Sequence, residues 1–484
     1  MSLTSMSACL AASSSKAATR WSTRLSRSIS SSSSPQSLAA ATHAHTQPLS
    51  PPLAKLDATH TLPRTARPDP FKILAPQVSD LQQNLVRLIG SAHPSLTDIA
   101  SYYFSLPGKQ LRPLLVFLIS RATNGLASGW SDKLRVSENG PYRRDDLDRP
   151  LSSSEVLTDW NPRMPDHTAS FSDVFSLDLL HRAPPIPIPS THKEDHDGIS
   201  NSNPHLQILP TQMRLAQISE MIHVASLLHD DVLDDAATRR SAESGPFKYG
   251  NKLSILGGDF LLGRTSTVLS RLGENEVVEL MASVISNLVE GEVMQVKEVE
   301  NAAALSRGGK GVSVEADRWA QYLQKTYFKT ASLMAKSTRS AVILGGARAG
   351  VQQDELLKDV AYAYGRNIGI AFQIIDDALD FSSSADLGKP GSGADLTLGL
   401  ATAPALYAYE EFEEMGPLIT RRFKAEGDVD KARELVLRSQ ALPRTRMLAQ
   451  QYADKAREIL TLLPQSEARD ALDVLAEKVV SRSK

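Results

Sequence analysis

The chain has 484 residues, of which 41% are hydrophobic and 22% are charged, a composition typical of a globular protein with a large core. Its net charge is −2, so it lacks the excess of basic residues that is typical of a nucleic-acid-binding protein. Its single cysteine, Cys9, excludes an internal disulfide framework. Because no uninterrupted apolar run reaches about 18 residues, we expect no transmembrane helix and at most peripheral membrane contact.

The first 56 residues contain no Asp or Glu and are rich in Ser, Ala and Arg. Arg20, Arg24 and Arg27 recur in this segment at helical spacing. An Arg- and Ser-rich, acid-poor leader is typical of a mitochondrial transit peptide, although a plain disordered tail shares much of this bias. We therefore expect residues 1–56 to be a transit peptide and disordered tail, and the proline-containing residues 57–70 to be a linker.

From Phe71 onward the sequence has the periodicity of one helix after another, without convincing period-2 strands. The clearest helical stretches are 213–235, 253–272, 276–300, 317–346, 353–382, 400–414 and 428–462. A Ser-, Pro- and Asp-rich stretch at 126–210 interrupts them, and we expect it to be a disordered surface insertion because strong helices flank it. The prediction is an all-α protein with one large helical bundle over 71–484.

Two short acidic clusters stand in otherwise apolar helical stretches. They are Asp230-Asp231-x-x-Asp234 and Asp376-Asp377-x-x-Asp380. On a helix, residues i and i+4 lie on one face, so each cluster offers a pair of carboxylates that point the same way. A carboxylate in an apolar interior is costly unless a cation neutralises it, and oxygen ligands without His or Cys suit Mg²⁺. We therefore expect a magnesium–diphosphate cavity rather than two solvated acidic faces.

Basic residues accompany these clusters. Arg239 and Arg240 follow the first cluster directly, and Lys109 and Arg112 lie three positions apart where a long apolar helix begins. Free N–H groups at a helix N-terminus attract anions, and the planar fork of arginine matches two phosphate oxygens. Either pair alone would pass for ordinary surface residues, but beside the acidic clusters they indicate phosphate binding.

Five segments resemble, in order, the motifs of the trans-isoprenyl diphosphate synthases. They are GKQLRP, LLHDDVLDDAATRR, YFKTASL, FQIIDDALDF and DLGKPGSGADLTLGLATAP. From about residue 68 to the C-terminus, apart from 126–210, the chain resembles the long-chain polyprenyl diphosphate synthases of mitochondria. The resemblance implies a helical bundle of the isoprenoid synthase type around a central cavity, with residues 71–484 as the catalytic domain.

The resemblance also implies an activity. A Mg²⁺-dependent prenyltransferase of this kind condenses isopentenyl diphosphate repeatedly onto an allylic diphosphate, such as farnesyl or geranylgeranyl diphosphate. The product would be a long all-trans polyprenyl diphosphate, the precursor of the ubiquinone side chain. The setting would be the mitochondrial matrix or the inner membrane surface, and the assembly a homodimer or a heteromer with a related subunit.

By the same resemblance, residues that match the family's motifs take specific roles. Isopentenyl diphosphate would be held by Lys109, Arg112, His223 and Arg240. The allylic diphosphate would lie against Arg239, Lys329, Thr330, Gln373 and Lys389. The catalytic carboxylates would be Asp230, Asp231, Asp234, Asp376, Asp377 and Asp380, and all of these except Asp231 are the expected Mg²⁺ ligands. Without the motif match, His223 would more simply be a core histidine and Gln373 a buried amide.

Small residues precede the first acidic cluster. Ala225 and Ser226 lie where shorter-chain members of the family typically carry an aromatic residue, so they would leave room for a long product. Close helix packing also favours small residues at such positions. Asp235 extends the cluster without an expected role.

Two other functions fit part of the pattern. A non-catalytic partner subunit of a heteromeric synthase would share the fold, but such subunits tend to lose one or both acidic clusters. A class I terpene cyclase would share the first cluster, but it would lack the second cluster and the GKQLRP element. Because this chain keeps all of them, the active synthase is the preferred hypothesis.

Overall fold

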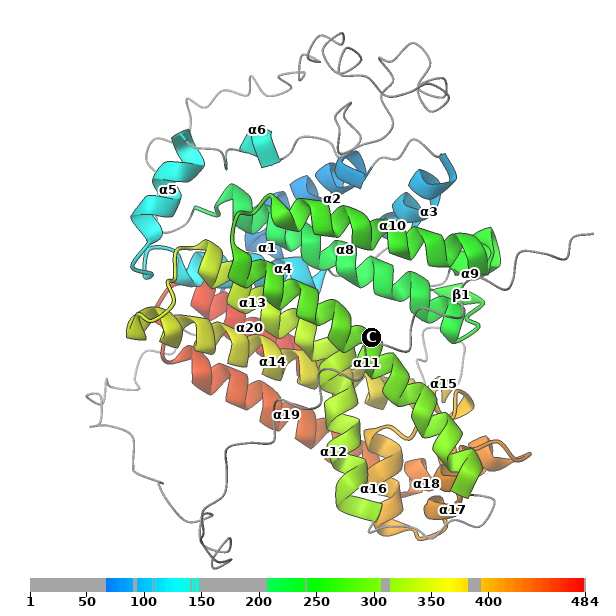
Figure 1. Cartoon of the computed structure of the whole chain (residues 1–484). Helices are drawn as coiled ribbons and strands as arrows, with labels where there is room; N and C mark the ends of the chain where they lie inside the picture. Colours follow the sequence, from blue (N-terminus) through cyan, green and yellow to red (C-terminus); the bar gives the residue numbers. More distant parts are fainter. Residues whose placement is uncertain are drawn as a thin grey trace, which may run out of the picture. The chain divides into compact units, whose positions relative to one another are not determined.

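The computed structural model describes residues 67–89, 94–106, 108, 110–139, 142, 144–147, 207–239, 242–305, 314–381 and 393–482. All of these lie within the compact unit that spans Leu62–Lys484. The expected leader at 1–56 and most of the 57–70 linker are outside the described residues. The described part is almost entirely helical, which confirms the predicted all-α class (Figure 1).

A bundle of long helices forms the larger part of the fold. Its members are α2 (Ala75–Ile89), α3 (Pro94–Ser105), α4 (Leu111–Thr123), α8 (Pro210–Leu233), α10 (Asn251–Ser270), α11 (Asn275–Leu305), α13 (Ser332–Leu344), α14 (Gln352–Asp380), α19 (Ala441–Leu460) and α20 (Glu467–Ser481). Helices α8, α13 and α14 are central, with α10 packed on α8 and α19 packed on α14 (Figure 1). Their apolar side chains form one continuous core.

Short helices after residue 393 surround a second, smaller core. These are α15 (Ala394–Thr397), α16 (Ala403–Glu411), α17 (Met415–Thr420) and α18 (Asp428–Arg438). Buried residues such as Met415, Leu418 and Leu435 pack together there. A third cluster, which includes Tyr322 and Ile374, joins this group to α14 and to α12 (Val314–Thr326).

The structure differs from the sequence expectations at four places, three of them within or next to the expected helices. The helix expected over 317–346 contains the π-helix η5 (Tyr327–Ala331) between α12 and α13. The helix expected over 428–462 is two helices, α18 and α19, and Glu411 accepts hydrogen bonds from the backbone N–H of Gln440 (3.0 and 3.1 Å) at the break. A two-residue antiparallel pair, β1 (Thr238–Arg239) and β2 (Ala242–Glu243), follows α8 and is too short to show alternation.

The stretch expected to be disordered also contains ordered structure. Helices α5 (Trp130–Asn139) and α6 (Arg144–Leu147) lie inside 126–210. Trp130 and Leu147 are buried, so apolar contact orders this part despite its polar composition. Residues 148–206 are outside the described residues.

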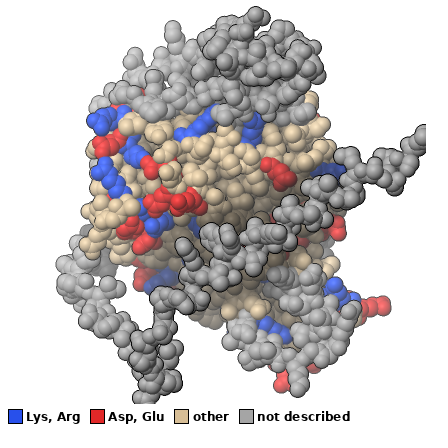
Figure 2. All heavy atoms as spheres, viewed as in Figure 1, with Lys and Arg blue, Asp and Glu red and all other residues tan. Residues whose placement is uncertain are grey.

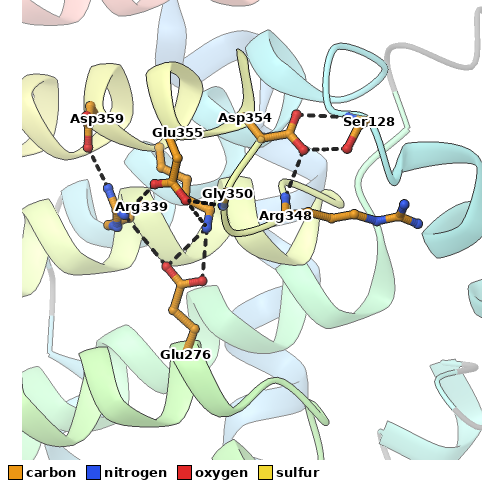
Figure 3. Close-up of polar contacts among 9 residues, drawn as sticks. Ser128, Glu276, Arg339, Arg348, Gly350, Asp354, Glu355 and Asp359 are labelled. Carbon is orange, nitrogen blue, oxygen red and sulfur yellow. Dashed lines mark hydrogen bonds and ion pairs between the residues drawn. The ribbon is translucent and has the colours of Figure 1, made fainter. Parts of the chain in front are cut away.

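Polar contacts fix the start of α14, far along that helix from its acidic cluster (Figure 3). Asp354 is fully buried and accepts hydrogen bonds from the backbone N–H groups of Ser128 (3.0 Å) and Arg348 (2.9 Å). Lys358, also buried, pairs with Glu276 of α11 at 3.0 Å. These bonds hold α14 against its neighbours, so the acidic residues at its other end are carried on a rigid element.

Among the described helices, none is both long and apolar enough to cross a membrane. Short helices that complete the described fold are α1 (Pro70–Ile73) and α9 (Gly245–Tyr249).

Candidate active site

The first acidic cluster lies at the C-terminal end of α8. The backbone N–H of Asp234 donates to the carbonyl of Asp230 at 2.8 Å, so these two residues occupy successive turns on one face. Asp235 then adopts the left-handed conformation (φ 48°), which aspartate tolerates better than most residues. Asp235 thereby ends α8 and reverses the chain, and Arg239 in β1 returns beside the cluster.

The middle residue of this cluster, Asp231, is fully buried and holds Arg239 in place. Its carboxylate accepts a hydrogen bond from Arg239 Nε at 2.9 Å and pairs with the same guanidinium through a second nitrogen. Burial by itself would lower the pKa of Arg239, but Asp231 and Asp230 raise it above its usual value. Arg239 is therefore a charged donor fixed next to the acidic face.

Asp230 and Asp234 experience an excess of negative charge. Burial, followed by the nearby carboxylate of Glu292, raises the pKa of Asp230 to about 7. Burial also raises the pKa of Asp234. Lys329 lies among these acids: it pairs with Glu292 at 2.6 Å and donates to Gln295 at 3.0 Å. Burial would lower the pKa of Lys329, but Glu292 and Asp230 outweigh it and raise the value.

The π-helix η5 connects this cluster to the second one. Its residue Lys329 interacts with the first cluster, and the next residue, Thr330, donates to Gln373 Oε1 of α14 at 2.8 Å. Gln373 Nε2 in turn donates to Asp377 at 2.9 Å. A π-helix inserts an extra residue into a helical turn and is often found at functional sites. As a result, Lys329 lies toward the first acidic cluster and Thr330 lies toward Gln373, beside the second.

The second cluster lies at the C-terminal end of α14. Asp377 is almost completely buried and accepts a hydrogen bond from Tyr322 of α12 at 2.6 Å. Burial raises the pKa of Asp377 to about 6, although the bonds from Tyr322 and Gln373 lower it. Asp376 pairs with Arg482, near the C-terminus, at 2.6 Å.

Asp380 joins the end of α14 to the start of α15. Its carboxylate accepts hydrogen bonds from the backbone N–H groups of Ala394 (3.0 Å) and Asp395 (3.1 Å). Asp395 is itself half-buried, and burial together with Asp377 and Asp380 raises its pKa well above the usual range. The second cluster is therefore accompanied by a fourth carboxylate, that of Asp395, beside the three in the motif.

The carboxylates of the two clusters fit a divalent cation. Burial is the main cause of the raised pKa values of Asp230, Asp234 and Asp377, and neighbouring carboxylates add to it. A hard cation with oxygen ligands would offset both effects. Within the described ranges no three His, Cys, Asp or Glu side chains converge on one point. Carboxylates on two different helices suit a divalent cation that shares its coordination shell with water and phosphate oxygens.

The other expected site residues are placed less completely. Arg112 lies in the first turn of α4 and His223 lies two turns before Asp230 on α8, both half-buried. Ala225 is fully buried in the main core, and the hydroxyl of Ser226 donates to the carbonyl of His223 at 2.8 Å. Lys109, Arg240 and Lys389 lie outside the described residues.

Several site residues were missed by sequence reasoning. They are Glu292, Gln295, Tyr322, Asp395 and Arg482, together with Tyr103 of α3, whose hydroxyl donates to Asp231 at 2.6 Å. Asp395 stands inside the fifth motif, and Tyr322 precedes Lys329 by two helical turns, so both carried a weak signal. Glu292 and Gln295 belong to a long helix with no distinguishing local pattern, and Arg482 reaches Asp376 from the far end of the chain.

Comparisons with known proteins show which family the chain resembles. The sequence profile of the polyprenyl synthetase family matches residues 201–436. A protein of Yarrowia lipolytica named probable hexaprenyl pyrophosphate synthase, mitochondrial, is 44% identical over 426 residues, which covers 86% of this chain and 85% of the relative. Decaprenyl-diphosphate synthase subunit 1 of Schizosaccharomyces pombe is 35% identical, covering 89% of this chain and 96% of the relative.

A solved structure shows the same fold. The polyprenyl synthase from Caulobacter crescentus CB15, complexed with calcium and isoprenyl diphosphate, matches with a TM-score of 0.59 and 26% sequence identity. The match covers 86% of this chain and 97% of that one. With relatives this similar over most of their length, and with both acidic clusters in one helical bundle, the chain belongs to the polyprenyl synthetase family.

Proposed function

We propose that this protein is a trans-polyprenyl diphosphate synthase that condenses isopentenyl diphosphate repeatedly onto an allylic diphosphate. The product is a long all-trans polyprenyl diphosphate that serves as the ubiquinone side-chain precursor. The observation that carries the proposal is the link between the acidic clusters, in which Lys329 faces one cluster and Thr330 reaches the other through Gln373.

The metal is Mg²⁺, held by Asp230 and Asp234 of the first cluster and by Asp376, Asp377 and Asp380 of the second. When bound, Mg²⁺ neutralises the departing diphosphate as a Lewis acid. The calcium in the Caulobacter structure supports a hard divalent cation at such a site. The burial of neighbouring carboxylates in both clusters also supports a divalent cation there.

The chain's own cations bind and orient the allylic diphosphate. Arg239 and Lys329 are fixed by carboxylates and stay charged, so they stabilise negative charge that develops as the allylic C–O bond breaks. Thr330 and Gln373 orient the same group, and Lys389 is proposed to join them. Positioning two substrates in one water-poor cavity supplies much of the remaining rate enhancement.

Isopentenyl diphosphate is proposed to bind where α4 begins. Arg112 in the first turn of α4, with Lys109, Arg240 and His223, gives this subsite its positive charge. A phosphate there also receives the N-terminal end of a helix dipole. The two diphosphates are thus bound by different elements, which allows one to leave and the other to stay.

A mitochondrial location accompanies this function. The Yarrowia relative is named as a mitochondrial protein, and the acid-free, arginine-containing segment 1–56 has the composition of a transit peptide.

The exposed face of α10 and α11 supports assembly with a second copy of this chain or a related subunit. Val289, Val293 and Val296 form an exposed stripe on α11, and Leu256 is exposed on α10. Figure 2 shows the part of this face over α10 as largely uncharged, with a few separate acidic and basic side chains. Apolar area of this kind often marks a protein–protein interface. The S. pombe relative, named as a subunit, is consistent with a partner.

Light scattering of the purified full chain tests the assembly. We expect a dimer, and we expect Val293→Lys to weaken it because a charge would have to be desolvated at the interface. A Lys substitution at Leu437, which is exposed on α18, serves as the control. A monomer that stays monomeric with the related subunit present would contradict the assignment of this face.

Substitution of the acidic residues tests the function itself. Asp230→Asn and Asp376→Asn should each lower turnover by about 10²-fold or more, because each removes charge that holds the cation at the leaving group. Asp430→Asn, at an exposed position of α18, should leave turnover unchanged. Helical circular dichroism should be retained in all three, and full activity in both site variants would contradict the proposal.

A further inference from the structure

In both acidic clusters the middle carboxylate is buried and bonded to a tyrosine. Asp231 accepts a hydrogen bond from Tyr103 Oη at 2.6 Å, and Asp377 accepts one from Tyr322 Oη at 2.6 Å. Each tyrosine is only 3% exposed and comes from another helix than its aspartate, Tyr103 from α3 and Tyr322 from α12. Two clusters on different helices therefore share one arrangement.

The direction of the tyrosine proton is determined in both cases. The backbone N–H of Gly245 donates to Tyr103 Oη at 2.7 Å, and the side chain of Thr326 is hydrogen-bonded to Tyr322. An ionised carboxylate can only accept, so each tyrosine gives its proton to its aspartate. A tyrosine hydroxyl has one proton to give, so a hydroxyl that already accepts a bond directs its proton to the carboxylate. Such charge-assisted O–H···O⁻ bonds are short and strong, and their geometry is well defined.

The second oxygen of each middle carboxylate orients a residue that faces the diphosphate. Asp231 uses it to hold Arg239, and Asp377 uses it to accept from Gln373 Nε2. A carboxylate fixed on one side by a tyrosine can therefore hold its other partner in one orientation. Without the hydroxyl, the buried carboxylate would lose a donor and could rotate.

We propose that Tyr103 and Tyr322 are positioning residues that fix the middle carboxylates of the two clusters and, through them, the side chains that bind metal and diphosphate. The inference rests on the function proposed above. Residues that orient metal-binding groups from behind typically change metal affinity or activity by about 10- to 100-fold when they are removed. The structure therefore assigns a measurable effect to two phenol hydroxyls that do not themselves touch substrate.

The test compares three Tyr→Phe variants of the full chain. Tyr103→Phe and Tyr322→Phe remove the two proposed positioning hydroxyls. The matched control is Tyr364→Phe, because Tyr364 is equally buried in α14 and donates to the backbone carbonyl of Leu472 at 2.7 Å, away from both clusters. All three variants lose one buried hydrogen bond, so a general loss of stability should affect them alike.

The readout is calorimetric binding of inorganic pyrophosphate in the presence of Mg²⁺, beside the Mg²⁺ dependence of turnover. We expect Tyr103→Phe and Tyr322→Phe to weaken binding by about 10-fold or more, and to raise the half-saturating Mg²⁺ concentration similarly. Tyr364→Phe should match the unchanged protein in both. Binding by both site variants that equals that of the unchanged protein would overturn the inference.

A second set of variants tests whether each tyrosine acts through its aspartate. In an Asp377→Asn background, Tyr322→Phe should weaken binding no further, and the same should hold for Tyr103→Phe with Asp231→Asn. Fully additive losses of binding would overturn the inference. If a Phe variant fails to fold, the Asn variants alone still weaken the same hydrogen bond and can be measured in its place. If the unchanged protein does not bind Mg²⁺-pyrophosphate, the proposed function fails; if it binds and the variants bind equally, only this inference fails.

Discussion

At the scale of single residues, the site is defined by carboxylates that are difficult to ionise. Burial raises the pKa of Asp230, in the first cluster, to about 7 and that of Asp377, in the second cluster, to about 6. Lys329 and Arg239 compensate only part of this negative charge, since both already pair with acidic groups. The remaining negative charge is what a bound divalent cation would offset.

The raised pKa of Asp230 predicts a pH dependence of stability. Between the ordinary value of 3.8 and about 7, the folded metal-free protein keeps a proton that the unfolded chain releases. Stability must therefore fall as pH rises through this window, and Asp234 and Asp377 shift in the same direction. We expect the thermal unfolding midpoint of the metal-free protein to be lower at about pH 8 than at about pH 6.

Mg²⁺ should remove much of this difference, because it binds the deprotonated carboxylates. The stabilisation by Mg²⁺ and pyrophosphate should therefore be larger at the higher pH. Calorimetric scans at both pH values, with and without the two additives, measure it. Equal stabilisation at both values would mean that these carboxylates do not titrate as the structure implies.

At the scale of elements, η5 is the feature on which the site depends. It fits between α11 and α14 only because glycines face it there. A Cβ at Gly369 would lie 2.6 Å from Ala331 Cα, and one at Gly291 would lie 2.7 Å from Lys329 Cγ. Close packing on both sides fixes the orientation of Lys329 and Thr330.

Gly369→Ala tests this dependence. The added methyl group must push η5 away from α14, which should cost about 1–3 kcal/mol of unfolding free energy. Turnover should fall as well, because Thr330 and Gln373 separate. Gln352→Ala, an exposed change on the same helix, should alter neither quantity. Urea unfolding and steady-state kinetics measure both effects, and normal turnover in a destabilised Gly369→Ala protein would contradict the role of η5.

The sequence shows why some elements were predictable and others were not. The acidic helices were predictable because i and i+4 spacing within apolar runs is a local signal, and the structure places Asp230 and Asp234 accordingly. The π-helix was not, since its apolar pattern is that of an ordinary helix. Contacts such as that between Arg482 and Asp376 join residues far apart in the chain, so no local sequence pattern predicts them.

Local composition was also misleading in one region. The polar stretch after residue 126 suggested disorder, yet Trp130 is buried and α5 forms there. A single large apolar side chain with a site to pack against outweighed the average polarity of its neighbours. By contrast, the all-α class followed from periodicity over hundreds of residues and was confirmed.

At the scale of the whole molecule, the fold must accommodate a product that grows. The main core contains Ala225, fully buried five positions before the first cluster, and the flexible side chains of Met221, Met281 and Met334. Methionine adapts its shape more readily than other apolar residues, so such a core can rearrange around an isoprenoid chain. Ala225→Phe would place a bulky ring in this path and should shorten the product.

The most direct test is chromatography of the products that the purified full chain makes from farnesyl diphosphate, isopentenyl diphosphate and Mg²⁺. We expect a long all-trans product in the hexaprenyl to decaprenyl range, dependent on Mg²⁺, and a shorter product from Ala225→Phe. A short-chain product from the unchanged protein, or a product distribution that Ala225→Phe leaves unaltered, would contradict it.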